Sequence, residues 1–239
     1  KQIPNKIEFS QNMRNNKGHA RCNAFGIRYL AKRNDYDHVI LMDGDGEDRP
    51  IEIEKLVEKA LLDKNKSVVA KRVKRSEGIF FQSLYQIHKI ITFVFTGKNI
   101  NFGNYSCLTM NDIKILSDKE SLWSSFSGSL KKHIPTLNSV NSIRGTRYFG
   151  PSKMSLYKLA IHSLSIIGVF KRTVFLRSTI LIILLSYFNL GEIDSVVISI
   201  FQILLVIFNL LVFLASLREN KLEFIESEKN ELSSKIYTH

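Results

Sequence analysis

Cysteine, proline and tryptophan are scarce in this sequence: its 239 residues include two Cys, four Pro and one Trp. Cys22 and Cys107 lie far apart and lack metal-site spacing, which excludes a disulfide framework and a cysteine zinc site. The six His residues are scattered, so a histidine metal cluster is not expected. The sequence contains no internal repeat or low-complexity segment, and the polar stretch that begins at Lys1 does not resemble a signal peptide.

Acidic residues are outnumbered by basic ones. The chain has 34 Lys and Arg against 22 Asp and Glu, which gives a formal net charge of +12. Such a surplus fits nucleic acid, an anionic membrane surface or an anionic ligand. Because the sequence has no helix-turn-helix, RNA-binding aromatic motif or zinc finger, we do not expect a nucleic-acid partner.

The first 150 residues alternate between strand and helix patterns. The short apolar run His38–Met42 is typical of a buried parallel strand. This alternation predicts an α/β sheet. We expect strands at 6–9, 38–42 and 67–70, and helices at 19–33, 51–62 and 79–95, the last packed on the domain. We expect a polar loop at 99–104 and a partly helical segment at 112–132.

Carboxylates alternate directly after the apolar run, at Asp43, Asp45 and Glu47. Open α/β sheets bind ligands at the carboxyl ends of parallel strands. Hard oxygen ligands suit Mg²⁺ or Mn²⁺, and such an ion would bridge a diphosphate and offset the charge on a departing nucleotide. A solvated acidic turn is the alternative. An EF-hand loop is disfavoured because Asp48 stands where that loop needs Gly, and Pro50 lies inside it.

A long apolar segment lies near the C-terminus. Residues 195–217 include about 23 uncharged residues, which as a helix would reach roughly 34 Å, enough for a hydrocarbon core of about 30 Å. The alternative is a buried helix of a large soluble core. A second apolar run, 174–190, has Arg177 near its start, and this side chain can snorkel to the interface. We therefore expect a transmembrane hairpin.

The flanks of the expected hairpin differ in charge. The link 191–194 carries two acids and no base, whereas basic residues flank the hairpin: Lys171, Arg172, Arg218 and Lys221. The positive-inside rule places the link outside and both ends in the cytoplasm. Before the hairpin, residues 154–170 could form an amphipathic helix in the interface plane, or an ordinary amphipathic helix on the domain. Attraction to anionic headgroups would explain much of the positive charge.

Four motifs follow one another along the chain. They are the Asn-x-Gly turn Asn16–Gly18, the Asp-x-Asp-x-(Gln/Glu)-Asp-x-Pro loop Asp43–Pro50, the strand Val68–Arg72 and the Arg-x-x-Gly-x-Ser-Lys segment Arg147–Lys153. In this order they resemble a family-2 glycosyltransferase of the GT-A fold, and most closely the branch that makes polyprenyl-phosphate sugars, as dolichyl-phosphate mannose synthases and their bacterial relatives do. The bacterial branch also continues into an interfacial helix and two membrane helices, so the resemblance covers nearly the whole chain.

The resemblance implies a domain organisation. It predicts a GT-A-like (Rossmann-like), mostly parallel sheet over 1–150 that lacks its N-terminal part. A juxtamembrane segment follows at 151–172, then a transmembrane hairpin at 173–218 (about 173–190 and 195–217) and a cytoplasmic tail at 219–239. The implied location is a bacterial inner membrane, with the catalytic domain on the cytoplasmic side. Four-subunit assembly is also implied by resemblance alone.

The resemblance also implies a chemistry: transfer of a sugar, with inversion, from a nucleotide-sugar to a membrane polyprenyl phosphate. Asp43, Asp45 and Glu47 would hold Mg²⁺ or Mn²⁺ and the donor diphosphate. Asp45, Arg147 and Lys153 would act in catalysis. Donor or acceptor phosphates would be faced by Arg72, Arg147 and Lys153, since the planar guanidinium fork can bond two phosphate oxygens.

Two departures from the family pattern affect these expectations. Only about 40 residues precede Asp43, and none predicts the strand and helix that bind the base. Together with the absent initiator Met, this indicates a chain that begins partway through a larger protein. Asn104 stands where relatives often carry Asp and cannot act as a base, but a phosphate acceptor is already ionised at neutral pH. A lipid-linked saccharide or other glycan as acceptor, or a non-catalytic membrane subunit, remain the alternatives.

Overall fold

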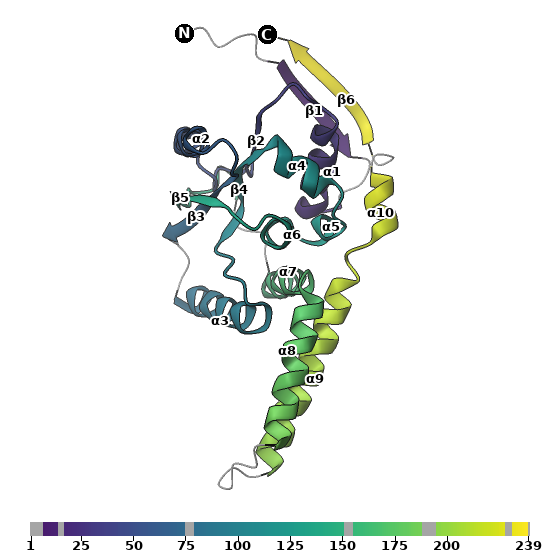
Figure 1. Cartoon of the computed structure of the whole chain (residues 1–239). Helices are drawn as coiled ribbons and strands as arrows, with labels where there is room; N and C mark the ends of the chain where they lie inside the picture. The colour runs from purple at the N-terminus through teal and green to yellow at the C-terminus, as the bar shows by residue number, and fades with distance from the viewer. Residues whose placement is uncertain are drawn as a thin grey trace.

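A mixed four-stranded sheet lies at the centre of the fold in the computed structural model, which describes residues 7–13, 17–74, 79–150, 155–187, 195–227 and 231–238. Its strand order is β2-β4-β3-β5 (Figure 1). The bounds are β2 His38–Leu41, β3 Val68–Lys74, β4 Phe102–Thr109 and β5 Asn138–Ile143. Of the expected strands in this sheet, 38–42 and 67–70 are confirmed, with β3 longer than expected.

The strand directions correct the expectation of a mostly parallel sheet. β4 runs antiparallel to both β2 and β3, and only β5 pairs with β3 in parallel. The segment 99–104, expected as a loop, leads into β4 at Phe102. The polar residues of 99–104 suggest a loop, but the residues that follow, Tyr105 to Thr109, are buried and form the part of β4 that lies between β2 and β3. The expectation that β2 pairs in parallel was therefore wrong.

Helices cover both faces of the sheet. Because successive strand residues point to opposite faces, Val69 of β3 joins one apolar cluster while Val68 and Ala70 join another. The Val69 cluster includes residues of α1 (His19–Ala31), α4 (Met110–Ser117), α5 (Ser121–Ser124) and α6 (Phe126–His133). The Val68 cluster includes residues of α2 (Ile53–Leu62), which follows the 3₁₀ turn η1 (Pro50–Glu52). The helices expected at 19–33 and 51–62 are thus confirmed.

Segments from the two ends of the chain form a second, two-stranded sheet. β1 (Ile7–Met13) pairs antiparallel with β6 (Glu231–Thr238). Figure 1 shows this pair as a purple and a yellow strand lying side by side. The strand expected at 6–9 therefore falls within β1, apart from residue 6, which lies outside the described residues. The expected tail 219–239 is structured in part, because it contains β6 and the short helix α10 (Lys221–Ile225).

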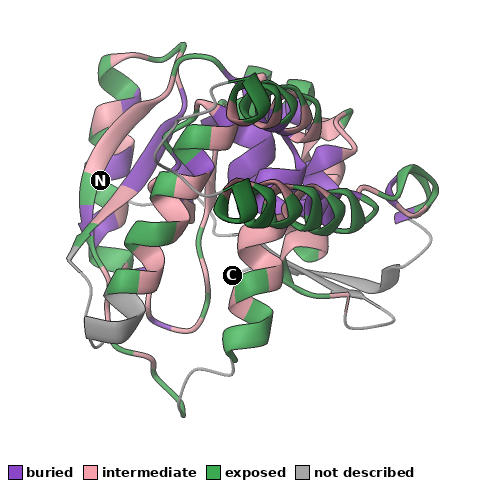
Figure 2. Cartoon of the chain, turned by 90° about the horizontal axis from the view of Figure 1, so that it is seen from below, coloured by how far each residue is buried: buried purple, intermediate pink, exposed green. Residues whose placement is uncertain are grey.

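Four longer helices lie at and beyond one end of the sheet domain: α3 (Ile79–Thr96), α7 (Leu156–Gly168), α8 (Lys171–Tyr187) and α9 (Ser195–Ser216). α3 and α7 lie against the domain, while α8 and α9 project from it side by side (Figure 1). The Gln202 side chain of α9 donates a hydrogen bond of 2.7 Å to Ser186 Oγ of α8. Figure 2 shows that the projecting pair is largely exposed, whereas buried residues gather in the domain.

One described segment, Ser195–Ile225, is long and apolar enough by length and composition to cross a membrane. Only 6% of its apolar stretch is buried within the chain, whereas the core helix of a soluble protein is mostly buried. α8 has 17 residues and does not meet the same length requirement. The expected link at 191–194 lies outside the described residues.

Candidate functional site

The acidic loop, Asp43–Arg49, follows β2 at its carboxyl end and is fastened to the segment after β5. The Gly145 amide donates to the Glu47 carbonyl at 2.8 Å, and the Tyr148 amide donates to the Asp45 carbonyl at 2.9 Å. Gly46 has a φ of 90°, in the left-handed region that favours glycine. A Cβ there would also come within 2.8 Å of the Tyr148 ring. The positive φ favours glycine at this turn, and the Tyr148 ring adds a steric reason.

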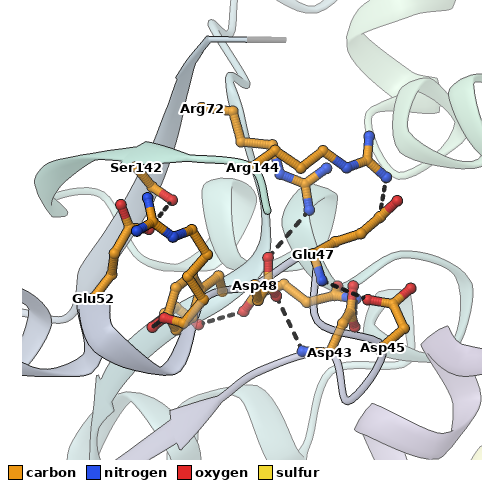
Figure 3. Close-up of polar contacts among 12 residues, drawn as sticks. Asp43, Asp45, Glu47, Asp48, Glu52, Arg72, Ser142 and Arg144 are labelled. Atoms are coloured by element: carbon orange, nitrogen blue, oxygen red, sulfur yellow. Dashed lines mark hydrogen bonds and ion pairs between the residues drawn. The ribbon is translucent and has the colours of Figure 1, made fainter. Parts of the chain in front are cut away.

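Two arginines bind the carboxylate of Glu47 (Figure 3 shows Arg144). Arg144 Nη2 donates to Glu47 Oε2, and Arg147 Nε donates to Glu47 Oε1 at 2.9 Å. Arg147 Nη2 also pairs with Asp45 Oδ2 at 3.0 Å, so this guanidinium bridges two carboxylates. Burial raises the pKa of Glu47, but the hydrogen bonds from Arg144 and Arg147 outweigh it and hold the pKa below its ordinary value.

Asp48 organises the acidic loop from within. Its side chain is 3% exposed. Its Oδ2 accepts a hydrogen bond of 3.0 Å from the Asp43 amide, and its Oδ1 faces Arg72 Nη2 of β3 at 3.4 Å. Burial raises the pKa of Asp48, with the Asp43 amide and Arg72 acting in the opposite direction. Asn104 of β4 donates to Asp43 Oδ1 at 3.1 Å, so β2, β3 and β4 all contribute to the site.

A buried carboxylate below the loop fixes the start of the arginine segment. Glu52 accepts hydrogen bonds from Ser142 Oγ at 2.6 Å and from the Ile143 amide at 3.1 Å (Figure 3). The Tyr105 hydroxyl donates to the Arg49 carbonyl at 2.8 Å. Burial and the nearby carboxylate charges raise the pKa of Tyr105 to about 12, so it remains a donor at neutral pH. These contacts set the position of the residues that follow β5.

The structure brings together five of the six site residues expected from the sequence. Asp43, Asp45, Glu47 and Arg147 belong to one connected network, and Arg72 joins it through Asp48. Lys153, the sixth, lies outside the described residues. Sequence reasoning missed the roles of Asp48 and Arg144. The spacing of Arg144 and Arg147, together with Asp48 inside the acidic motif, was the available signal.

Asp43, Asp45 and Glu47 remain a prediction as metal ligands. Among the described residues, no group of three His, Cys, Asp or Glu side chains is arranged so that it could hold an ion. Both carboxylate oxygens of Glu47 are bound by arginines. Asp43 and Asp45 still present carboxylates from one loop. Mg²⁺ is commonly bound by one or two carboxylates together with substrate phosphates. Asp45 is engaged too, because its Oδ1 accepts from the Glu47 amide and its Oδ2 pairs with Arg147, each at 3.0 Å. The pair therefore fits such an ion once Arg147 releases Asp45, with Glu47 positioning the arginines.

The sequence model for Glycosyl transferase family 2 matches residues 4–124, just over half of the chain. The chain belongs to glycosyl transferase family 2. No curated protein and no solved structure matches it. Family membership implies a GT-A fold, a nucleotide-sugar donor and an acceptor. The matched part of this glycosyltransferase includes the acidic loop and Arg72, and it ends before Arg144 and Arg147.

Proposed function

We propose that this glycosyltransferase moves a sugar, with inversion, from a nucleotide-sugar to a polyprenyl phosphate in a membrane. The carrying observation is that one chain combines the acidic loop, bridged by Arg147, with the exposed apolar helix α9. The loop supports a donor diphosphate site. The helix supports an acceptor that is itself embedded in a membrane.

In the proposed reaction, an oxygen of the acceptor phosphate attacks the anomeric carbon on the face opposite the nucleotide. The bond between that carbon and the diphosphate oxygen breaks, and the nucleotide diphosphate leaves with the electron pair. A Mg²⁺ or Mn²⁺ ion bound through Asp43 and Asp45 would offset the charge of the leaving group. Asn104 keeps Asp43 in place by its hydrogen bond, and no base is needed because the phosphate is already ionised.

Arginine supplies the positive charge that a diphosphate requires. Arg147 pairs with Asp45 and Glu47, and its planar fork can bond two phosphate oxygens in place of a carboxylate. Arg144 stays with Glu47, so the loop remains fastened when Arg147 turns to the donor. Arg72, on the other side of Asp48, can face a phosphate of the donor or of the acceptor. Lys153 remains a proposed catalytic residue on the same segment as Arg147.

The proposed attachment uses several helices. We propose that α8 and α9 form a transmembrane hairpin with the domain on the cytoplasmic side of a bacterial inner membrane. α3 exposes apolar side chains close to the base of these helices: Ile87, Ile90, Phe93 and Val94. Arg177 of α8 donates to the Val94 carbonyl at 2.7 Å, which ties α3 to the hairpin. α7 exposes Leu156 and Tyr157, so both helices can rest on the interface.

The test is a transfer assay with the intact protein in nanodiscs that contain undecaprenyl phosphate, supplied with nucleotide-sugars and Mg²⁺ or Mn²⁺. We expect metal-dependent transfer, reduced about 100-fold or more by Asp45→Ala. Asp118→Ala, an exposed aspartate after α4, is the matched control and should retain activity. Metal-dependent transfer that survives Asp45→Ala would contradict the assigned role. If a competing lipid-linked saccharide receives the sugar in preference to undecaprenyl phosphate, then the lipid-linked saccharide is the acceptor and the proposed acceptor is wrong.

A further inference from the structure

Three histidines from three helices gather between the sheet domain and the projecting helices. His19 is the first residue of α1, His88 belongs to α3 and His162 to α7. The rings of His19 and His162 lie 5.8 Å apart, centroid to centroid, at an interplanar angle of 49°. His88 Nδ1 lies 3.4 Å from Thr92 Oγ1 on its own helix. The donor site described above uses none of these histidines.

Titratable and charged groups from four parts of the chain lie around His162. They are His19 of α1, His88 of α3, Arg218 after α9 and Arg72 of β3. Burial, together with these charges, lowers the pKa of His162 to about 4. In the free protein His162 is therefore neutral at pH 7, and Arg218 and Arg72 supply positive charge near it. An anion would complement this location.

Two neighbouring features favour the same ligand. The N-terminus of α1 has no side-chain capping hydrogen bond and no acidic residue in its first turn, and a helix N-terminus favours negative charge. α3 contains no acidic residue. These features support an anion site, whose main components are the histidines and arginines.

Arg72 connects the histidines with the donor site. Its guanidinium faces Asp48 at 3.4 Å, and its charge also acts on His162. Gly103 allows this close approach, because a Cβ there would lie 3.3 Å from Arg72 Nη2. The positive cluster thus adjoins the acidic loop and lies next to the helices proposed to enter the membrane.

We propose that His19, His88 and His162, with Arg72 and Arg218, form a phosphomonoester site that receives the phosphate of the lipid acceptor. This inference rests on the proposed function and adds the residues that recognise the acceptor. A phosphate monoester carries up to two negative charges and accepts hydrogen bonds from imidazole and guanidinium groups. Its charge would favour protonated His162, so binding would take up a proton and strengthen as the pH falls from 8 to about 6.5, above the second ionisation of the phosphate itself near pH 6.

The experiment measures binding to the full chain in nanodiscs without a nucleotide-sugar. Undecaprenyl phosphate is the probe, phosphate-free undecaprenol is the lipid control, and inorganic phosphate is the soluble competitor. His162→Gln and His19→Gln should each weaken undecaprenyl phosphate binding about tenfold at pH 6.5 and reduce its pH dependence. His133→Gln is the matched control, because burial and neighbouring lysines also lower the pKa of His133 to about 4, and it pairs with Ser121.

Unchanged affinity in both histidine variants, or equal binding of undecaprenol, would overturn the site. If inorganic phosphate binds with the same dependence on the histidines but does not displace undecaprenyl phosphate, the site binds free phosphate and the proposed lipid ligand is wrong. His19 is exposed, so His19→Gln keeps the test open if His162→Gln does not fold. Nucleotide-sugar binding is measured separately. If the protein binds no nucleotide-sugar but still binds the lipid in a histidine-dependent way, the result counts against the proposed transfer and not against this site.

Discussion

Glu47 joins the acidic loop to the segment after β5 through two arginines. It accepts hydrogen bonds from Arg144 and Arg147, and Arg147 also reaches Asp45. We expect Glu47→Gln to lower the free energy of unfolding by about 1–3 kcal/mol at pH 7, because two guanidinium groups lose a charged acceptor. Urea denaturation of both proteins measures this difference.

The effect of Glu47→Gln should depend on pH. The folded state lowers the pKa of Glu47, so its stabilisation is complete above its ordinary pKa of about 4.3 and is lost as the pH falls through the folded value. The difference between wild type and variant should therefore be constant from pH 5 to pH 7 and shrink below pH 4. A difference that stays constant down to pH 3 would contradict this account.

Gly46 has both a conformational and a steric reason to be glycine. Gly46→Ala should destabilise the protein by about 1–2 kcal/mol from the positive φ alone, with an added contribution from the Tyr148 ring. Tyr148 is 61% exposed, so its ring can move aside. In the double variant Gly46→Ala, Tyr148→Ala only the backbone contribution should remain. Equal costs for Gly46→Ala in both backgrounds would exclude the steric part.

The sequence patterns predicted which residues belong to the site, but not which side chains those residues contact. Asp43, Asp45 and Glu47 could be predicted because they alternate after an apolar run, and Arg147 because it lies in a family motif. The pairing of Glu47 with arginines could not be predicted, since it depends on how the segment after β5 folds back on the loop. Asp48 resembles any loop aspartate until its burial is known.

At the scale of elements, α10 packs back onto the sheet domain. Glu223 accepts a hydrogen bond of 3.1 Å from Trp123 Nε1 of α5, and the Phe224 ring lies edge-on to the Trp123 ring at 6.2 Å. Arg28 of α1 donates to the Phe224 carbonyl and, at 2.7 Å, to Ser227 Oγ. Short as it is, this helix is therefore attached at several points.

Phe224→Ala should detach α10 and destabilise the protein by about 3 kcal/mol, because the Phe224 side chain is buried. Trp123 is the only tryptophan in the sequence, so its fluorescence reports directly on this contact. We expect a red-shifted emission and a lower melting temperature. Leu222→Ala is the control on the same helix, since Leu222 is 73% exposed. Unchanged Trp123 emission in Phe224→Ala would show that α10 is not held there.

Elements with a strong local pattern were predictable, and those defined by distant partners were not. α1 and α2 carry apolar residues at helical spacing, and α9 is apolar over its whole length. β4 starts at Phe102, continues with Gly103 and Asn104, and becomes a strand because β2 and β3 pair with it on both sides. β5 has the sequence Asn-Ser-Val-Asn-Ser-Ile, whose polar residues do not alternate with apolar ones, so only its pairing with β3 identifies it as a strand.

At the scale of the whole molecule, the proposed transmembrane hairpin implies that the link 191–194 and the sheet domain are on opposite sides of the membrane. In whole cells, a membrane-impermeant maleimide should label Glu192→Cys in a Cys22→Ser background. The native protein provides the control: Cys22 is exposed on the domain and should react only after permeabilisation, while Cys107 is buried. Labelling of Cys22 in intact cells would reverse the topology, and failure of Glu192→Cys to react would contradict the exposed link.

The chain passes from the sheet domain to the projecting helices at one place and returns to the domain at another. Before α8, α7 packs against α6, where Lys132 Nζ donates to the Val169 carbonyl at 2.8 Å. After α9, α10 returns to α1 and α5. Because the sheet domain is attached both before α8 and after α9, it cannot rotate freely about one flexible linker. The acidic loop would therefore stay at a fixed height above the bilayer. Acceptors would then have to arrive by lateral diffusion, and turnover would follow their mole fraction in the membrane rather than their concentration in bulk solution.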